Sequence, residues 1–461
     1  VDIHPLAEIV NYVENLEVKE LARKCEERMW AEIATHFHQP TAHLVGPYSR
    51  AYTVDMVGHT HLFNALAYLV FGKRVFVNPV NDLFPIREKQ VIHIGLDTLM
   101  WPNIIWLISS DYHCPDYLLD IALKKEYPFS VICRSEGLPS LIEGTRKDPI
   151  TGHESKFENL LEYPGYSGPN TTYMTEDYAL GTAYSQFHDG GLTESFYLVY
   201  RKKIPSVCLT DTGVVFSKYI INEKKPEQEQ YYNVYGICGK DAFRDEGRKY
   251  GIQYRGCSMM VYKPKQFEAH NIYSMKLSIL FPCHFDSIDQ VYLGEEKLIN
   301  LSGKSEKPLS VFVKDGPVYM AFKPLFLTNH GREHAVKVEQ IDNYLIISFY
   351  NYEGPARSFE IRDVLLTSTG FIAHIKSAAE FGSFHEFINY ASQGIIRDKI
   401  SKQEGAYTRW IEYKRDDLSF NFAYSPISEG IIIDTINGRS RPDSVFQASS
   451  LDCSRLPFLD K

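Results

Sequence analysis

The sequence lacks several features that would assign it to a common class of protein. It has no run of roughly twenty apolar residues, so we expect no transmembrane helix. No glycine-rich nucleotide motif (GxGxxG or GxxxxGK[ST]) is found, and neither is an HExxH or a GxSxG motif. Nucleotide-dependent chemistry, zinc proteolysis and α/β-hydrolase chemistry therefore lose support.

The sequence also lacks a metal-binding cysteine motif and an excess of basic residues. The eight cysteines form no CxxC pair and no metal-ligand spacing, which favours buried thiols. The formal net charge of −9 argues against a general polyanion binder, so we expect no nucleic-acid partner. No signal peptide is visible and the chain opens on Val1, so the numbering is expected to describe a processed or trimmed product.

The pattern of apolar residues changes near residue 127. Before it, apolar residues recur at helical spacing, with helices expected over 5–35, 56–71, 96–109 and 115–125. After it, short β-branched and aromatic runs, among them 214–221, 231–237 and 359–366, alternate with turn residues, which is typical of an antiparallel sandwich. A lone short helix is expected over 383–391. We predict an α+β protein by segregation, divided into a helical domain (1–130), a bridging loop region (131–170), an antiparallel β-sandwich (171–400) and a C-terminal β extension packed on the sandwich (401–461).

The densest reactive cluster lies in the segment 36–64, HFHQPTAHLVGPYSRAYTVDMVGHTHLFN, which contains five of the sixteen histidines. Arg50 and Tyr52 are two apart and could project together from an extended GPYSRAY loop, while His59, His61 and Asn64 follow. Imidazole, phenol and guanidinium side chains together supply proton transfer and an anion clamp. The alternative is a polar interhelical loop in which histidines cap helix ends and tyrosines pack.

Three further constellations stand outside that segment. His113 precedes a helix start opened by Pro115, where the helix dipole favours its neutral form and hence proton acceptance. Tyr184 and His188 lie in a 170–191 stretch of short strands with a Gly-Gly turn, and Gln253 and Arg255 are expected to begin a strand after a charged loop (241–249). An arginine facing a cleft could pair bidentately with a carboxylate. Loop packing, cross-strand pairing and surface ion pairing are the respective alternatives.

A helical N-terminal part with a His/Tyr/Arg-rich junction, followed by a large antiparallel sandwich, resembles the toroid-plus-sandwich polysaccharide lyases. This group holds the heparinase-II/III-like and chondroitin-AC-type enzymes. Four later phrases are also similar to its β-region, namely YMTEDYALG (173–181), YGIQYRGCSMMVYKP (250–264), VYMAFKPL (318–325) and GFIAHIKSAAEFGSFHEF (370–387). The chain has fewer expected helices than a complete α/α toroid, so the resemblance implies a short, partial one.

The resemblance implies β-elimination on a uronic-acid polysaccharide. An Arg, Asn, Gln or His neutralises the C6 carboxylate, a Tyr or His removes the C5 proton, and a Tyr or His protonates the leaving O4. Matched residue types give Tyr52 or His113 as base and acid, and Arg50 with Asn64 or Gln253 on the carboxylate. Tyr184 or His188 completes the cleft from the β-region, and His59, His61 and Arg255 are further substrate-binding candidates.

Two other functions remain open on the sequence. A glycoside hydrolase would use paired carboxyl groups, for which Asp55, Asp177 and Asp189 are candidates. A non-catalytic carbohydrate-binding protein would use the same cleft without chemistry. We expect no cofactor, leave a divalent metal open, and expect an acidic polysaccharide or oligosaccharide as partner, no membrane association, and an extracellular or periplasmic location.

Overall fold

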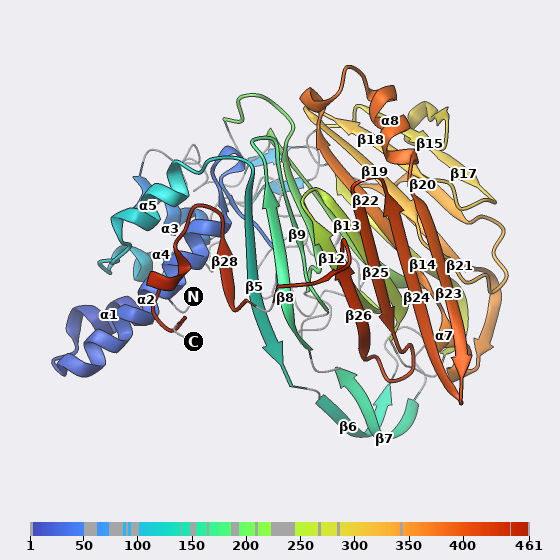
Figure 1. Cartoon of the computed structure of the whole chain (residues 1–461), viewed down its shortest axis with the longest axis horizontal. Helices are drawn as coiled ribbons and strands as arrows, with labels where there is room; N and C mark the ends of the chain where they lie inside the picture. Colours follow the sequence, from blue (N-terminus) through green and yellow to red (C-terminus); the bar gives the residue numbers. More distant parts are fainter. Residues whose placement is uncertain are drawn as a thin grey trace.

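The protein has a helical part at one end and a body of antiparallel sheets at the other (Figure 1). The computed structural model describes residues 3–49, 62–72, 86–88, 91–93, 101–138, 140–147, 154–163, 166–185, 193–207, 211–222, 245–265, 269–283, 286–341, 344–442 and 444–459. Antiparallel strands dominate this part of the chain, as the sequence predicted. None of the helices in these ranges has the length and apolar character that crossing a bilayer demands.

The N-terminal helices follow the apolar periodicity closely. They are α1 (Ile3–Tyr12), α2 (Leu16–His36), α3 (Leu62–Phe71), α4 (Trp101–Ile108) and α5 (Asp116–Leu123). The single helix expected over 5–35 is two helices, because Asn15 restarts the chain as an N-cap. Its side-chain oxygen accepts from the backbone N–H groups of Glu17 and Val18 at 3.0 and 3.1 Å.

A buried tryptophan organises the helical core. Trp30 of α2 is fully buried, and its ring centroid lies 6.2 Å from those of both Phe71 and Tyr112. The same apolar cluster includes Phe129 and Ala179 from the neighbouring sheet. The helices are therefore packed on the sheet body rather than tethered to it, and Figure 1 shows them beside its β5–β28 edge.

The largest sheet has ten strands in the described part of the chain. In spatial order they are β17 (Gly303–Ser305), β20 (Val336–Ile341), β21 (Tyr344–Phe359), β14 (Ala269–Pro282), β11 (Thr212–Ile221), β10 (Phe196–Arg201), β9 (Tyr178–Thr182), β8 (Tyr166–Met174), β5 (Phe129–Gly137) and β28 (Phe446–Ala448). Every residue of β11 is buried, so both faces of the sheet are covered at its centre.

A second sheet packs face to face on the first. Its seven strands, in spatial order, are β12 (Gly247–Tyr254), β13 (Cys257–Pro264), β22 (Thr369–Ser377), β19 (Val318–Pro324), β18 (Val311–Asp315), β15 (Gln290–Leu293) and β16 (Glu296–Lys297). Alternate residues of both sheets, among them Val215, Leu277 and Met320, form one large apolar core between them. This pair of sheets is the predicted sandwich.

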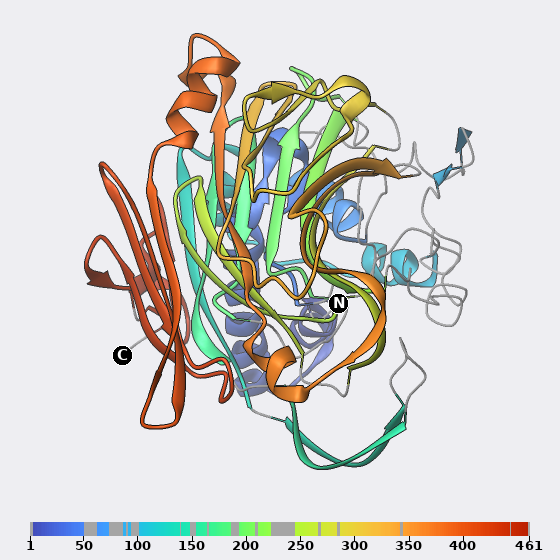
Figure 2. The same cartoon turned by 90° about the vertical axis from the view of Figure 1, so that its right-hand side faces the viewer.

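A third layer covers the other face of the seven-stranded sheet. Its five strands are β23 (Ile395–Gln403), β24 (Ala406–Arg415), β25 (Leu418–Tyr424), β26 (Ile431–Ile436) and β27 (Arg439–Ser440). Their inward residues, such as Ile411 and Phe420, pack against Ile252 and Met259 of the seven-stranded sheet. Figure 2 shows this five-stranded sheet as the outermost layer of the body. Its strands lie between residues 395 and 440, whereas β28, also within the expected 401–461 extension, belongs to the ten-stranded sheet.

Two assignments were wrong. The 131–170 segment, expected to be a bridging loop, is largely strand: β5 and β8 belong to the ten-stranded sheet, and β6 (Ser140–Lys147) pairs with β7 (Glu154–Tyr163). Its polar and Gly/Pro content concealed strands such as β5 and β8, whose residues are only partly buried. The strand expected over 359–366 ends at Phe359, and α7 (Ile361–Leu366) follows. Its adjacent residues Val364 and Leu365 are both buried, which the alternation of a half-buried strand would not give.

The remaining short elements complete the chain. They are β1 (Phe37–His38) paired with β2 (His43–Leu44), β3 (Ile86–Glu88) paired with β4 (Val91–His93), and α8 (Phe384–Ser392). The helix α8 was predicted over 383–391. Near the C-terminus, β28 pairs with β5, so the end of the described chain returns to the sheet edge beside the helices. The strand expected over 231–237 lies outside the described residues.

Candidate functional site

Half of the predicted site residues fall within the described ranges. The side chains of His113, Asn64, Tyr184, Gln253 and Arg255 can be placed, whereas Arg50, Tyr52, His59, His61 and His188 lie outside the residues that the structure describes. The described five occupy two regions. His113 and Asn64 belong to the helical part, and the other three lie around β9 and β12.

His113 is held by a buried carboxylate. Its Nδ1 lies 2.8 Å from Glu26 Oε2, and its backbone N–H donates to Glu26 Oε1 at 2.8 Å. The Trp30 indole N–H also donates to Glu26 Oε1, at 3.2 Å. Glu26 is fully buried while the His113 side chain is 33% exposed. Because an ionised carboxylate only accepts hydrogen bonds, Nδ1 carries the proton and Nε2 is left as the basic nitrogen.

Asn64 lies in the core of the helical part. Its side chain is 1% exposed, and its amide nitrogen donates to Ala42 O at 2.9 Å. The contact ties α3 to the turn between β1 and β2, where Ala42 has the left-handed backbone angle φ of 53°. These contacts favour a structural role for Asn64, and its substrate-binding role stays a prediction.

Tyr184 packs at the corner where the sheets meet. The guanidinium carbon of Arg441 lies 4.2 Å from the centre of its ring, and burial raises the pKa of its phenol. Its carbonyl accepts from the backbone N–H of Gly251 at 3.0 Å. Tyr184 is thereby fixed beside β12, and its aromatic ring has the geometry of a cation–π contact.

Gln253 and Arg255 both belong to the β12–β13 hairpin, but the first is buried and the second is exposed. Gln253 is 3% exposed, and its amide nitrogen donates to Leu180 O and Arg255 O at 3.1 and 3.0 Å. Arg255 occupies the turn with a φ of 52° and is exposed, its guanidinium 5.3 Å from the Tyr254 ring centre. The structure therefore brings Tyr184, Gln253 and Arg255 to neighbouring strands, with the arginine exposed, the tyrosine half-buried and the glutamine buried.

The junction after β2 is docked on the outer face of the ten-stranded sheet. Tyr48 N–H donates to Glu194 O at 3.0 Å and Glu194 N–H donates to Tyr48 O at 2.9 Å. The Tyr48 ring meets Tyr197 edge to face, with centroids 4.9 Å apart. Thr172 Oγ1 donates to Gly46 O at 2.9 Å. This short segment carries the chain from the helical part onto the sheet.

Gly181 shows how close that approach is. A Cβ atom at this position would lie 1.8 Å from Gly46 O. Only glycine allows the backbone of the junction to lie directly on β9. The close contact therefore requires glycine at position 181 of the sheet, where the backbone of Gly46 and Pro47 in the junction lies against it.

A buried group of four charges lies behind the Tyr48–Glu194 pairing, and sequence analysis missed it. Lys218 Nζ is 2.5 Å from a Glu194 carboxylate oxygen, and Lys249 is paired with Asp245. All four side chains are at most 1% exposed, and Lys249 Nζ also donates to Thr193 O at 3.0 Å. The available signal was Lys218 inside the apolar run VVFSKYII, because a lysine buried there requires a partner.

The two carboxylates of this corner cluster (Glu194, Lys218, Asp245 and Lys249) have pKa values shifted in opposite directions. Burial raises the pKa of Glu194 to about 6, although Lys218 and Lys249 oppose the shift. For Asp245 burial acts in the same direction, but Lys249, Lys218 and Lys265 outweigh it and lower the pKa. Burial lowers the pKa of Lys249. The cluster thus combines a firmly ionised carboxylate with one that titrates near neutrality.

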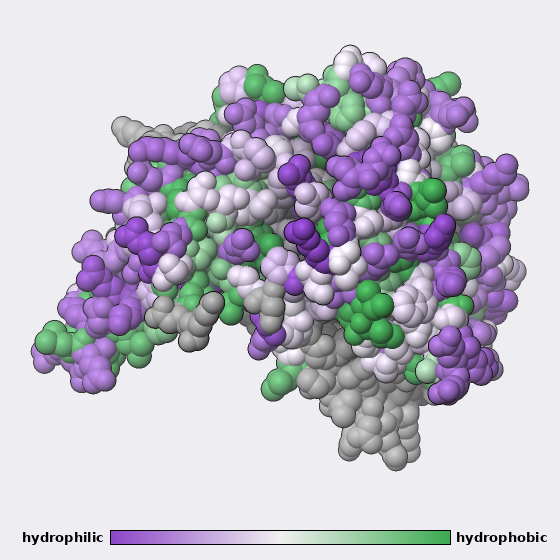
Figure 3. Space-filling view, in the orientation of Figure 1, coloured by the Kyte–Doolittle hydropathy of each residue, from purple (hydrophilic) through white to green (hydrophobic). Residues whose placement is uncertain are grey.

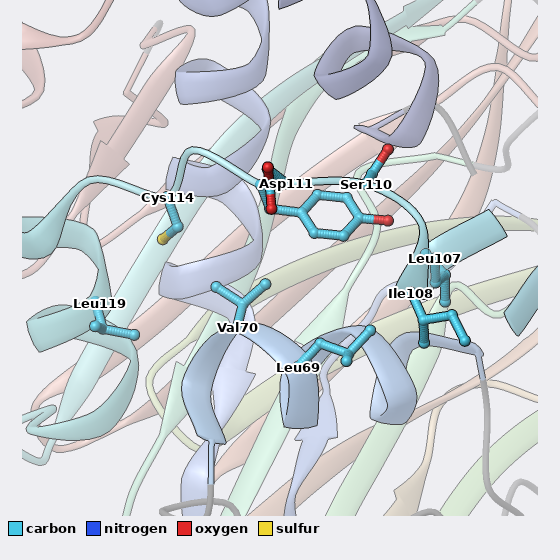
Figure 4. A pocket seen from close by; sticks show the side chains of 9 residues that line it. Leu69, Val70, Leu107, Ile108, Ser110, Asp111, Cys114 and Leu119 are labelled. Carbon is cyan, nitrogen blue, oxygen red and sulfur yellow. The ribbon is translucent and has the colours of Figure 1, made fainter. Parts of the chain in front are cut away.

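A cavity of about 320 Å³ lies in the helical part. Leu69 and Val70 of α3 face the segment from Ser110 to Cys114 across it (Figure 4). Burial raises the pKa of Cys114 to about 12, so this thiol is not an activated nucleophile. His113 is not among the lining residues, which combine apolar side chains such as Leu69 and Leu107 with the polar Ser110 and Asp111.

Other candidate groups have structural partners. His38 is buried between Thr41 Oγ1 and Thr175 O at 2.8 and 2.7 Å, and burial lowers its pKa to about 3. Asp177, a carboxylate proposed for hydrolysis, pairs with Arg201 at 2.6 Å. Asp55 and Asp189 lie outside the described residues. Within the described ranges, no group of three or more His, Cys, Asp or Glu side chains could hold a metal ion.

Comparison with known proteins finds no matching family model and no matching curated relative. The assignment of function therefore depends on the residues and contacts above.

Proposed function

We propose that the protein is a polysaccharide lyase that cleaves a uronic-acid-containing glycan by β-elimination. The active groove would lie between a partial, toroid-like helical part and the outer face of the ten-stranded sheet. The observation that carries this proposal is the pairing of Tyr48 with Glu194. It joins the flank of the segment bearing Arg50 and Tyr52 to the flank of the segment bearing His188.

Arg50 and Tyr52 lie outside the residues that the structure describes, but they follow Tyr48 by only two and four positions in the sequence. Their closeness to Tyr48 along the chain favours a site near the Tyr48–Glu194 pairing. This supports a site built from both parts of the molecule.

The proposed chemistry assigns one task to each residue type. Arg50 neutralises the uronate carboxylate, which makes the C5 proton acidic enough to remove. Tyr52 or a histidine takes that proton and a second such group protonates the leaving O4, so that a C4–C5 double bond forms as the glycosidic bond breaks. His113 suits the role of base by its Glu26-held tautomer, provided that substrate reaches the helical part.

A single substitution tests the assignment of the phenol. Tyr52→Phe removes only the hydroxyl, and we expect turnover on a cleaved polyuronate to fall by about 10²- to 10⁴-fold, the usual contribution of a general acid or base. Tyr12→Phe is the matched control, because Tyr12 is 70% exposed on α1. Full turnover by Tyr52→Phe would remove this residue from the mechanism.

A further inference from the structure

The five-stranded sheet presents a flat outer face with an exposed tryptophan at its centre. Trp410 of β24 is 39% exposed, on the face opposite to the buried Ile411 and Tyr413. Its cross-strand neighbours are Lys399 on β23 and Ala423 on β25. Ala423 is fully buried although it belongs to this outer face, so its larger neighbours cover it.

The rows next to Trp410 carry hydrogen-bonding groups. In the neighbouring row, Arg397 pairs across the strands with Glu412, Glu412 with Asn421, and Asn421 with Thr435. Arg397 Nη1 lies 3.2 Å from Glu412 Oε2, with the arginine side chain 75% exposed. Strands lie about 4.8 Å apart and same-face residues about 7 Å apart along a strand, so these groups lie within about one sugar-ring length of the indole.

The charge of this face is opposite to that of the whole protein. Its exposed cations are Arg397, Lys399 and Lys414, and the carboxylate among them is Glu412. The complete chain has a formal net charge of −9. A local cationic surface on an acidic protein is complementary to an anionic partner. Figure 3 shows this side of the molecule, where hydrophilic and hydrophobic residues are mixed over β23–β26.

We propose that the outer face of β23–β26 is a second glycan-binding surface, separate from the groove, which holds an acidic polysaccharide. The indole of Trp410 would stack on the CH face of a sugar ring, Asn421 and Thr435 would bond its hydroxyls, and Lys399 and Lys414 would attract its carboxylates. The choice of an acidic glycan rests on the proposed function. The aromatic platform itself rests on the position of Trp410.

The test is affinity electrophoresis of the full chain through gels containing alginate, polygalacturonate or neutral dextran. We expect both polyuronates to retard the wild type and dextran not to. Trp410→Ala should weaken retardation by about five- to tenfold, in line with the worth of one aromatic stacking contact. Trp106→Ala is the matched control, since Trp106 is 59% exposed on α4 and far from this sheet in sequence.

A second variant keeps the test valid if Trp410→Ala fails to fold. Lys399→Gln combined with Lys414→Gln changes only exposed positions, and it should weaken retardation and reduce its dependence on salt. The proposal is overturned if neither polyuronate retards the wild type, if both variants migrate as the wild type, or if dextran retards it equally.

Binding and cleavage are read separately. Retardation that depends on Trp410, without unsaturated product from any polyuronate, would refute the lyase and retain the platform. Formation of unsaturated product, together with unchanged binding by Trp410→Ala, would support the lyase and refute the second binding surface. Cleavage of short oligosaccharides should be the same in the wild type and Trp410→Ala, because the platform is outside the groove.

Discussion

Tyr48 and Glu194 are 146 positions apart and are joined by two backbone hydrogen bonds of 3.0 and 2.9 Å. The pairing attaches the segment after the first helices to the ten-stranded sheet, beside a buried group of four charged side chains. It is the point at which the two halves of the proposed groove meet. The proposed groove depends on the contacts that hold this segment against the sheet.

The first prediction concerns the close approach at Gly181. Gly181→Ala places a methyl group against Gly46 O, which must displace the junction, and we expect a loss of about 1–3 kcal/mol in the free energy of unfolding, as for other overpacked sites. Urea denaturation measures it. Gly430→Ala is the control, because its nearest neighbour would be Ser428 Oγ at 3.9 Å, and it should change stability little. Equal stability of the two variants would show that the junction is not held as described.

The second prediction concerns the tautomer of His113. Glu26→Gln replaces an acceptor by an amide, and an amide N–H facing Nδ1 would move the imidazole proton to Nε2. If His113 is the base, both His113→Ala and Glu26→Gln should lower turnover by about 10²-fold or more. The control is Glu27→Gln, whose carboxylate accepts from Tyr117 at the surface. Full turnover by His113→Ala would exclude His113 and leave the proton transfers to the junction.

The third prediction concerns the attachment of the five-stranded sheet. Arg409 pairs with Asp398 through two bonds, Nε to Oδ1 at 2.9 Å and Nη2 to Oδ2 at 2.6 Å, and also donates to Thr369 O. Arg409→Met leaves a buried carboxylate without its partner, which costs about 3–5 kcal/mol. Lys124→Gln breaks an exposed pair with Asp120 and should cost less than about 1 kcal/mol. Chemical denaturation of both variants compares them, and similar losses would contradict the anchoring role.

The fourth prediction is a pH dependence. Burial raises the pKa of Asp315 to about 6, opposed by Lys202 and by the Tyr200 hydroxyl, which donates to Oδ2 at 2.6 Å. The folded protein then holds this proton more tightly than the unfolded chain does. Its contribution to stability is therefore complete below the unfolded pKa near 3.8 and is lost as the pH rises through about 6.

Asp315→Asn removes that titration. The difference in unfolding free energy between wild type and variant should change by about 2–3 kcal/mol between pH 4 and pH 7, with the wild type losing stability relative to the variant. Thermal or urea unfolding across this range measures it. A difference that is constant with pH would show that Asp315 is already ionised at pH 4.

The sequence was informative where periodicity and burial agree. Runs of β-branched and aromatic residues such as Val214–Ile221 predicted strands, and this strand is buried on both faces. The partly exposed strands β5 and β8 were missed, since polar residues and glycine there resemble a loop. Ile361–Leu366 was misread because a short apolar run fits either a strand or a helix.

The site was less accessible to sequence reasoning because its contacts are long-range. Glu26 lies 87 residues from His113, and Tyr48 lies 146 residues from Glu194, so no local pattern links them. Asn64 and Gln253 have the right chemistry for substrate binding, yet their amides bond to backbone carbonyls in the interior. Residue type suggested the chemistry, and only the fold separates a buried amide from an available one.

The most direct test of the lyase proposal is an absorbance assay of the full chain against alginate, pectate, glucuronan, ulvan and glycosaminoglycans. β-Elimination creates an unsaturated uronate that absorbs in the ultraviolet, and hydrolysis does not. The proposal predicts that absorbance rises with time on at least one of these polymers and that Tyr52→Phe suppresses the rise. New reducing ends without any rise in absorbance would contradict it in favour of hydrolysis, and no change on any polymer would contradict it as well.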